Sequence, residues 1–147
     1  MLNVNVLSLS IFQLMNPCKI IVLYGRANLG KTRTLRMVID KLNDEPISNV
    51  KYDTQTICHY NDLTIAVATR GDNADELRSN VAYFKSYPCD IAITAARSRG
   101  GTHDVIKAYA QEIGAEVVWI YKRFEAGDEN EVNLRWAERV TQECVKD

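Results

Sequence analysis

The chain has 147 residues, of which 46% are hydrophobic and 25% are charged, a composition typical of one soluble globular domain. Its 18 basic and 19 acidic residues give a formal net charge of -1. This balance excludes a global positive field that would draw the protein to nucleic acid or anionic lipid. A chain of this length buries enough surface to fold without metal or disulfide staples.

Its four cysteines lie far apart and form no C-x-x-C pair, so the sequence gives no support for a zinc ribbon or a thioredoxin-type site. We expect all four to be reduced: Cys18, Cys58, Cys89 and Cys144. No apolar run approaches the roughly 20 residues that a membrane-spanning helix needs. The first sixteen residues carry no Lys or Arg, which argues against a secretory signal and predicts a cytoplasmic chain without membrane partners.

Two interpretations of residues 1–16 remain open. They form an N-terminal arm that packs on the domain, or they are a mis-assigned start and translation begins at Met15 rather than Met1. Met15 stands just before Pro17, where a first core strand is expected to follow. The folded domain is predicted to span residues 17–147 in both cases.

In chain order, the regular pattern begins at Lys19. Residues 19–24 are rich in β-branched apolar side chains, as a strand buried on both faces requires. A glycine-containing loop follows, and apolar residues then recur at helical spacing until Asn43 and Pro46: Leu35, Val38, Ile39 and Leu42. Residues 54–60 and 63–69 are β-rich and are separated by Asn61-Asp62, which predicts a hairpin.

The second half of the chain alternates helices and strands. Helices are predicted from the apolar positions of residues 74–84, 102–113 and 132–144, and strands at residues 91–95 and 117–121. Thr102 is the expected N-cap of the middle helix. This alternation predicts one α/β domain, whose mostly parallel five-stranded sheet contains one hairpin and is covered by helices.

The most specific motif matches G-x-x-x-x-G-K-[ST] and lies between the first predicted strand and the first predicted helix: Gly25, Arg26, Ala27, Asn28, Leu29, Gly30, Lys31 and Thr32. Glycines let the backbone aim successive N–H groups at a phosphate, and the helix N-terminus adds positive potential. Lys31 is the expected partner of the β- and γ-phosphates, and the Thr32 hydroxyl is an expected Mg²⁺ ligand. Arg33, which follows directly, is grouped with the nucleotide-binding residues.

Through this Walker A motif and the order of its elements, the chain resembles the P-loop NTPase superfamily. No particular family within it is recognised. The resemblance implies a three-layer P-loop NTPase-like fold, a bound nucleoside triphosphate and Mg²⁺. The motif covers eight residues, and the looser resemblance of element order extends from Lys19 to about Cys144.

The resemblance also implies an acidic metal partner at the carboxyl end of a neighbouring strand. Asp62 and Asp90 precede their strands and are expected at the opposite edge, whereas Asp72 follows residues 63–69 and falls on the correct side. Asp72 is therefore predicted to be the catalytic and metal-binding acid. Its alternative role is to cap the next helix, because the sequence departs from the superfamily pattern of hydrophobic residues that run directly into Asp. Glu76 could orient water, but we expect it to face solvent.

A second glycine-bearing loop, residues 94–102, carries Arg97 and Arg99 at the same predicted edge. Guanidinium groups suit phosphate recognition and stabilise charge that develops during phosphoryl transfer, so both are predicted catalytic residues. The alternative is a solvated loop. Arg70 is a weaker candidate of the same kind. No N-K-x-D motif is present, which favours ATP over GTP, although GTP remains an alternative.

The sequence thus predicts an ATP-binding, Mg²⁺-dependent P-loop NTPase that cleaves the β–γ phosphate bond. Hydrolysis is expected to be slow without an activating protein partner. The alternatives are a small-molecule or nucleotide kinase, and a regulatory module that binds nucleotide without turnover. The absence of a long insertion that would form a lid counts against the kinase.

Overall fold

The structure is a computed structural model that describes residues 16–47 and 54–146. Met15, the alternative start, and most of the predicted arm lie outside the described residues. Five strands form one sheet: β1 (Lys19–Tyr24), β2 (Gln55–Tyr60), β3 (Leu63–Ala68), β4 (Ile91–Ala96) and β5 (Glu116–Tyr121). The helices among the described residues are α2 (Lys31–Leu42), α3 (Ala74–Ser86), α4 (Gly101–Ile113) and α5 (Glu129–Cys144).

The strands lie in the order β2-β3-β4-β1-β5, and all neighbouring pairs except β2 and β3 are parallel. The predicted hairpin is confirmed, since β2 and β3 pair antiparallel around Asn61 and Asp62, both of which have positive φ angles. β1 pairs in register with both neighbours, so that Tyr24 lies between Ala96 of β4 and Tyr121 of β5.

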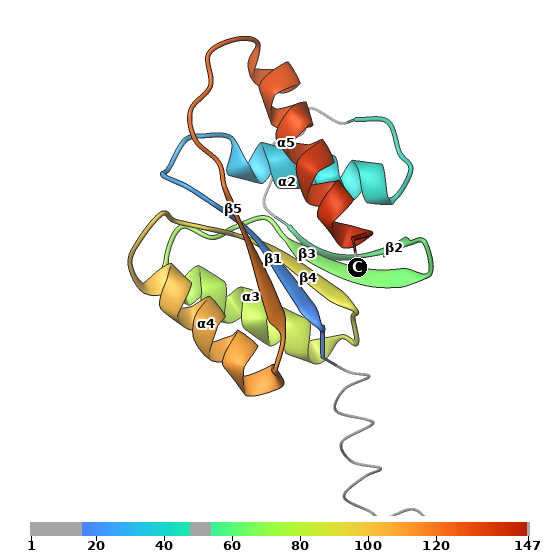
Figure 1. Cartoon of the computed structure of the whole chain (residues 1–147), viewed down its shortest axis with the longest axis vertical. Helices are drawn as coiled ribbons and strands as arrows, with labels where there is room; N and C mark the ends of the chain where they lie inside the picture. The colour runs from blue at the N-terminus through green and yellow to red at the C-terminus, as the bar shows by residue number, and fades with distance from the viewer. Residues whose placement is uncertain (1–15, 48–53, 147) are drawn as a thin grey trace, which may run out of the picture.

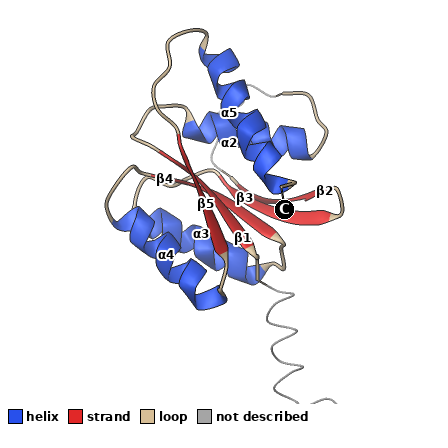
Figure 2. Ribbon diagram, viewed as in Figure 1, coloured by secondary structure: helices blue, strands red, loops and turns tan. Residues whose placement is uncertain are grey.

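Helices cover both faces of the sheet (Figure 1; Figure 2). Alternate β1 residues point to opposite faces because side chains alternate along a strand. Ile21 and Leu23 belong to the apolar core under α2 and α5, whereas Ile20 and Val22 belong to the core under α3 and α4. The predicted α/β class and mostly parallel five-stranded sheet are therefore confirmed.

The handedness of strand–helix–strand connections explains which helix lies on which face. From β1 the chain moves past β4 to reach the hairpin, whereas β3, β4 and β5 follow one another in the opposite direction across the sheet. Right-handed crossovers in opposite directions place their helices on opposite faces. The loops that leave β1 and β4 therefore diverge, and they open a crevice at the carboxyl end of these two neighbouring strands.

The four cysteines carry no disulfide. Cys58, Cys89 and Cys144 are buried, and burial raises the pKa of each thiol, to about 11 for Cys58 and about 12 for the other two. These three cysteines are small apolar residues of the core. No helix in the described part of the chain is long and apolar enough to cross a membrane.

Candidate functional site

The glycine loop, residues 25–32, connects β1 to α2 and forms one side of the crevice. Gly30 is the N-cap of α2 with φ 80°, and its carbonyl accepts hydrogen bonds from the backbone N and the Oγ1 of Thr34, at 2.9 and 2.7 Å. The first turn of α2 contains no acidic residue. The positive end of the helix dipole is therefore not neutralised from within its own first turn, which favours an anion in front of the loop.

Gly30 is required for two separate reasons. Its positive φ is disfavoured for residues that have a Cβ atom. A Cβ atom added there would also lie 2.8 Å from Nδ2 of Asn133, a residue of α5 that is 1% exposed. The position of the loop thus depends on a helix more than 100 residues further along the chain.

Lys31 is the central charged residue of the loop. Its Nζ donates hydrogen bonds to the backbone carbonyls of Gly25 and Arg26, at 2.7 and 2.6 Å, and the residue is only 6% exposed. Burial lowers the pKa of Lys31 to about 8; the Asp72 carboxylate counteracts this effect, and the charges of Arg97 and Lys122 add to it. The surroundings of Lys31 therefore favour its positive charge less than water does.

Asp72 and Thr32 line the same cavity as Lys31. This cavity, called the phosphate cavity after the ligand that the sequence predicts, has a volume of about 230 Å³ and is bordered by Asn28, Gly30, Lys31, Thr32, Arg33 and Asp72. The Thr32 hydroxyl donates to the carbonyl of Thr69 at 3.3 Å. Thr69 follows β3 directly, so this contact brings the end of β3 to the start of α2. The choice of Asp72 over the other aspartates requires this arrangement, because Asp72 lies in the loop after β3.

Asp62 and Asp90 lie at the other edge of the sheet, as predicted. Asp62 belongs to the hairpin turn, and Asp90 precedes β4, where its carboxylate accepts a hydrogen bond from the backbone N of Thr64 at 2.7 Å. Asp72 does not cap α3. The N-cap of this helix is Asn73, whose side chain accepts a hydrogen bond from the backbone N of Glu76.

Arg97 extends from the loop after β4 toward Asp72, with 3.3 Å between its Nε and the Oδ1 of the aspartate. The backbone of Arg97 is held from α4. Its N–H donates to the Thr102 hydroxyl at 3.3 Å, and its carbonyl lies 2.7 Å from Nε2 of His103. The structure thus brings Arg97 to the site, whereas Arg99 is exposed in the same loop.

The prediction that Thr102 caps α4 is wrong. The helix begins at Gly101, its N-cap is Gly100 with φ 96°, and Thr102 lies buried within the first turn. Gly100 and Gly101 turn the chain into the helix one residue earlier than the sequence pattern indicated. The Thr102 side chain therefore accepts a hydrogen bond from Arg97 and does not cap the helix.

The expectation that Glu76 faces solvent is also wrong. Its side chain is 15% exposed and makes two interactions: Oε1 accepts from the backbone N of Asp72 at 2.8 Å, and Oε2 lies 2.5 Å from Nε of Arg70. Asn80, one turn further along α3, donates to the carbonyl of Arg70 at 2.7 Å. α3 therefore positions the loop that carries Asp72.

Arg33 borders the phosphate cavity, but its guanidinium also connects α2 to α5. It lies 3.3 Å from the Glu129 carboxylate and donates to the Asn130 side chain at 2.6 Å. His59 is exposed on β2. Within residues 16–47 and 54–146, no group of three or more His, Cys, Asp or Glu side chains is placed to hold a metal ion.

Sequence reasoning missed the role of two residues that support the glycine loop. Lys122, directly after β5, is 2% exposed and donates through Nζ to the carbonyl of Leu29 at 2.5 Å. The same Nζ lies 5.9 Å from the ring centroid of Trp136, and burial lowers the pKa of the ammonium. Asn133 is the second, and its Nδ2 is buried without a hydrogen-bond partner. The sequence did contain one signal for this role, because Asn133 is a polar residue inside the apolar stripe of the last predicted helix.

A second cavity lies beside the glycine loop, between the loop after β5 and α5. It has a volume of about 260 Å³, and its lining includes Asn28, Leu29, Lys122, Phe124 and Asn133. Phe124 is 68% exposed, so its ring is open to stacking by a flat ligand.

Comparisons with models of protein families, with curated protein sequences and with solved structures found no match.

Proposed function

We propose that the protein is a P-loop NTPase that binds ATP with Mg²⁺ and cleaves its β–γ phosphate bond. The observation that carries the proposal is the buried Lys31 ammonium, whose two hydrogen-bond partners are neutral carbonyls of the glycine loop. A buried cation needs a counter-charge, and a polyphosphate in front of the α2 N-terminus supplies one. Lys31, Thr32 and Asp72 border one cavity at the crevice of the sheet, where ligands of open α/β folds bind.

The oxygen atoms of Thr32 and Asp72 fit the preference of Mg²⁺ for hydroxyl and carboxylate ligands. Magnesium usually takes only one or two protein ligands besides water and phosphate oxygens, so a larger cluster of acidic residues is not needed. When bound, Mg²⁺ would neutralise charge on the β- and γ-phosphates. Asp72 would hold the ion, and Lys31 with the loop N–H groups would stabilise the charge of the transferring phosphoryl group.

Arg97 is the proposed partner of the γ-phosphate. Its guanidinium lies beside the Asp72 carboxylate in the crevice, and its backbone is fixed by Thr102 and His103 of α4. A pre-positioned guanidinium can stabilise charge during phosphoryl transfer without reorganising. Arg99, which is exposed in the same loop, is the candidate for contact with a protein partner or an anionic acceptor.

The nucleoside is expected in the cavity beside Phe124. That cavity borders Asn28 and Leu29 of the glycine loop, so a base stacked on the Phe124 ring would lie next to the phosphates. ATP is the preferred nucleotide and GTP the alternative. A binding module without turnover remains the alternative of a different class. The kinase alternative is favoured by a further cavity beside Arg70, described below.

Asp72→Asn tests the assignment. The neutral amide keeps the size of the side chain but removes the negative charge that would hold Mg²⁺, so Mg²⁺-dependent release of phosphate from ATP should fall by about a hundredfold. Release is followed by a coupled phosphate assay across a range of Mg²⁺ concentrations. Asp104→Asn is the matched control, because Asp104 is exposed on α4 and lines neither the phosphate cavity nor the cavity beside Arg70. Equal release from the wild-type protein and Asp72→Asn would contradict the role of Asp72.

A further inference from the structure

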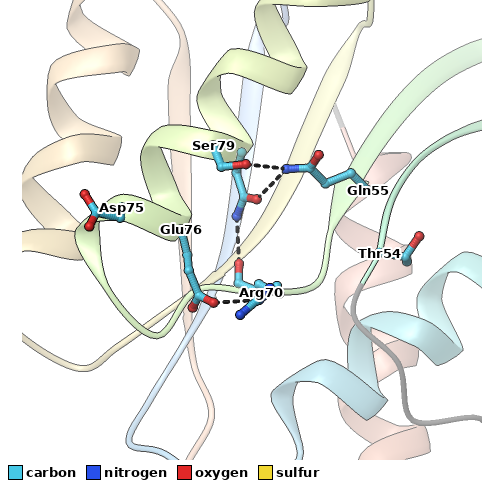
Figure 3. A pocket seen from close by; sticks show the side chains of 7 residues that line it. Thr54, Gln55, Arg70, Asp75, Glu76 and Ser79 are labelled. Carbon is cyan, nitrogen blue, oxygen red and sulfur yellow. Dashed lines mark hydrogen bonds and ion pairs between the residues drawn. The ribbon is translucent and has the colours of Figure 1, made fainter.

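A third cavity, here called the side cavity, opens at the same edge of the sheet (Figure 3). It has a volume of about 410 Å³ and lies between the start of β2, the loop after β3 and the first turns of α3. β2 runs antiparallel to the other strands, so its first residues lie where the parallel strands end. Lining side chains come from Thr54, Gln55, Arg70, Asp75, Glu76 and Ser79.

The side cavity and the phosphate cavity adjoin at Thr69 and open at the same edge of the sheet. The Thr69 hydroxyl accepts from the backbone N of Thr54 at 2.8 Å on one side, and the Thr69 carbonyl accepts from the Thr32 hydroxyl on the other. Glu76 is shared in the same manner, because one carboxylate oxygen faces Arg70 and the other accepts from the backbone N of Asp72. A ligand in the side cavity therefore lies against the loop that carries Asp72.

The floor of the side cavity is a fixed polar network. Gln55 Nε2 donates to the Ser79 hydroxyl at 3.2 Å and to Oδ1 of Asn80 at 3.0 Å (Figure 3). Asn80, which is 2% exposed, donates in turn to the carbonyl of Arg70 and to the Thr94 hydroxyl. Asn80 and Thr94 are the buried members of this network, whereas Gln55 and Ser79 are exposed. The buried Asn80 amide therefore fixes one polar wall of the cavity, which suits a polar ligand.

The charge of the lining selects the ligand further. Both carboxylates of the lining are ion-paired, Glu76 with Arg70 and Asp75 with Arg78, and the rest of the lining is amide and hydroxyl. An anionic ligand would find both guanidinium groups already paired with carboxylates, and an apolar ligand would leave polar groups unpaired. A neutral compound with several hydroxyl groups can donate to the carboxylates and accept from the guanidinium.

We propose that the side cavity binds the phosphoryl acceptor, and that this acceptor is a neutral compound with adjacent hydroxyl groups, as found in a free sugar or in the ribose of a nucleoside. The inference rests on the proposed ATP-cleaving function and specifies its acceptor. The acceptor oxygen forms a bond with the γ-phosphorus, the bond from that phosphorus to the β–γ bridging oxygen breaks, and ADP leaves with the electron pair. The hydroxyl proton passes to an oxygen of the transferred phosphoryl group and from there to water.

Phosphorus NMR tests the proposal directly. The full chain is incubated with ATP and Mg²⁺ and with D-ribose or adenosine, and the phosphomonoester signal of the product is recorded. The two compounds distinguish a sugar site from a nucleoside site. Ribose 5-phosphate is the anionic control, which should bind poorly because both guanidinium groups at the cavity are already paired with carboxylates. A phosphorylated product is expected from ribose or adenosine and not from ribose 5-phosphate.

Ser79→Leu fills the side cavity from an exposed helical position and should reduce product formation by at least about tenfold. Ser86→Leu makes the same change on the exposed end of α3, outside the cavity, and should retain product formation. Thermal melting with ATP is measured on every sample. A melting shift with ATP but no phosphorylated product from either compound would overturn this proposal, as would equal product formation by Ser79→Leu and Ser86→Leu. No ATP-induced shift in the wild-type protein would contradict the proposed function itself.

Discussion

At the scale of single residues, Lys31 determines the electrostatics of the glycine loop. Its ammonium is buried and held by two carbonyls, and its pKa falls to about 8. The unliganded loop thus holds its lysine proton weakly. A bound polyphosphate places negative charge beside the ammonium and raises this pKa again. Nucleotide binding at the proposed site is therefore expected to be coupled to proton binding at Lys31.

This coupling predicts the pH dependence of nucleotide affinity. Below pH 8 the free protein already carries the proton, so affinity should not change with the charge of Lys31. Above pH 8 the free protein loses the proton that the complex retains, and the dissociation constant for ATP should rise by up to about tenfold per pH unit. Titration calorimetry from about pH 7 to about pH 10 measures the dissociation constant for ATP. The charge of the phosphate groups stays constant in this range, because their second pKa of about 6 lies below it.

Lys31→Arg is the control for the pH effect, since a guanidinium stays protonated throughout this range. An equally steep loss of affinity in Lys31→Arg would assign the effect to another group. The stability of the unliganded protein should change with pH in the opposite direction to the affinity. The pKa of Lys31 is lower in the folded than in the unfolded chain, so the unfolded chain binds more protons between pH 8 and 10.5, and this group makes unfolding less favourable as pH rises.

At the scale of elements, the glycine loop is supported from α5 and from the end of β5. Asn133 lies against Gly30, and the Lys122 ammonium binds the carbonyl of Leu29. Arg33 adds an ion pair and a hydrogen bond from α2 to the first turn of α5. The geometry of the loop therefore depends on contacts between distant parts of the chain as well as on its own glycines.

Gly30→Ala tests this support. Alanine at a left-handed position costs about 1–2 kcal/mol in the free energy of unfolding, and overpacking against the buried Asn133 amide should add about 1 kcal/mol or more. Gly114→Ala is the matched control, because Gly114 has φ 70° with no atom near the added Cβ. Urea denaturation measures both variants. Equal losses of stability would show that Asn133 does not constrain the loop.

The elements themselves could be predicted from local sequence, but several contacts of the site could not. Periodicity and turn residues suffice to predict five strands, the hairpin at Asn61-Asp62 and the placement of Asp72 at the edge of the glycine loop. The roles of Lys122, Asn133 and Glu76 depend on which segments pack together, and short-range patterns contain little information about that. Thr102 failed as a cap for a local reason, because Gly100 turns the chain before it.

At the scale of the whole molecule, the strand order places the candidate site. β1 and β4 are neighbours whose following helices cover opposite faces of the sheet, and their loops carry Lys31 and Arg97. β3, the next strand, ends at Thr69, whose carbonyl reaches Thr32. Three separate connections thus converge on one crevice, and the side cavity adds the start of β2. No single segment would position these groups alone.

The most direct test of the central claim is thermal melting with Mg²⁺ and ATP, GTP or inorganic tripolyphosphate, on the wild-type protein and on Lys31→Met. A ligand that binds only the folded state raises the melting temperature, by an amount equivalent to about 2.7 kcal/mol at a hundred times its dissociation constant. ATP and tripolyphosphate should raise the melting temperature of the wild-type protein and not that of Lys31→Met, which should melt no lower without ligand because it no longer buries a charge. Equal shifts in the two proteins, or no shift with any phosphate at millimolar concentration, would contradict a polyphosphate site in the glycine loop.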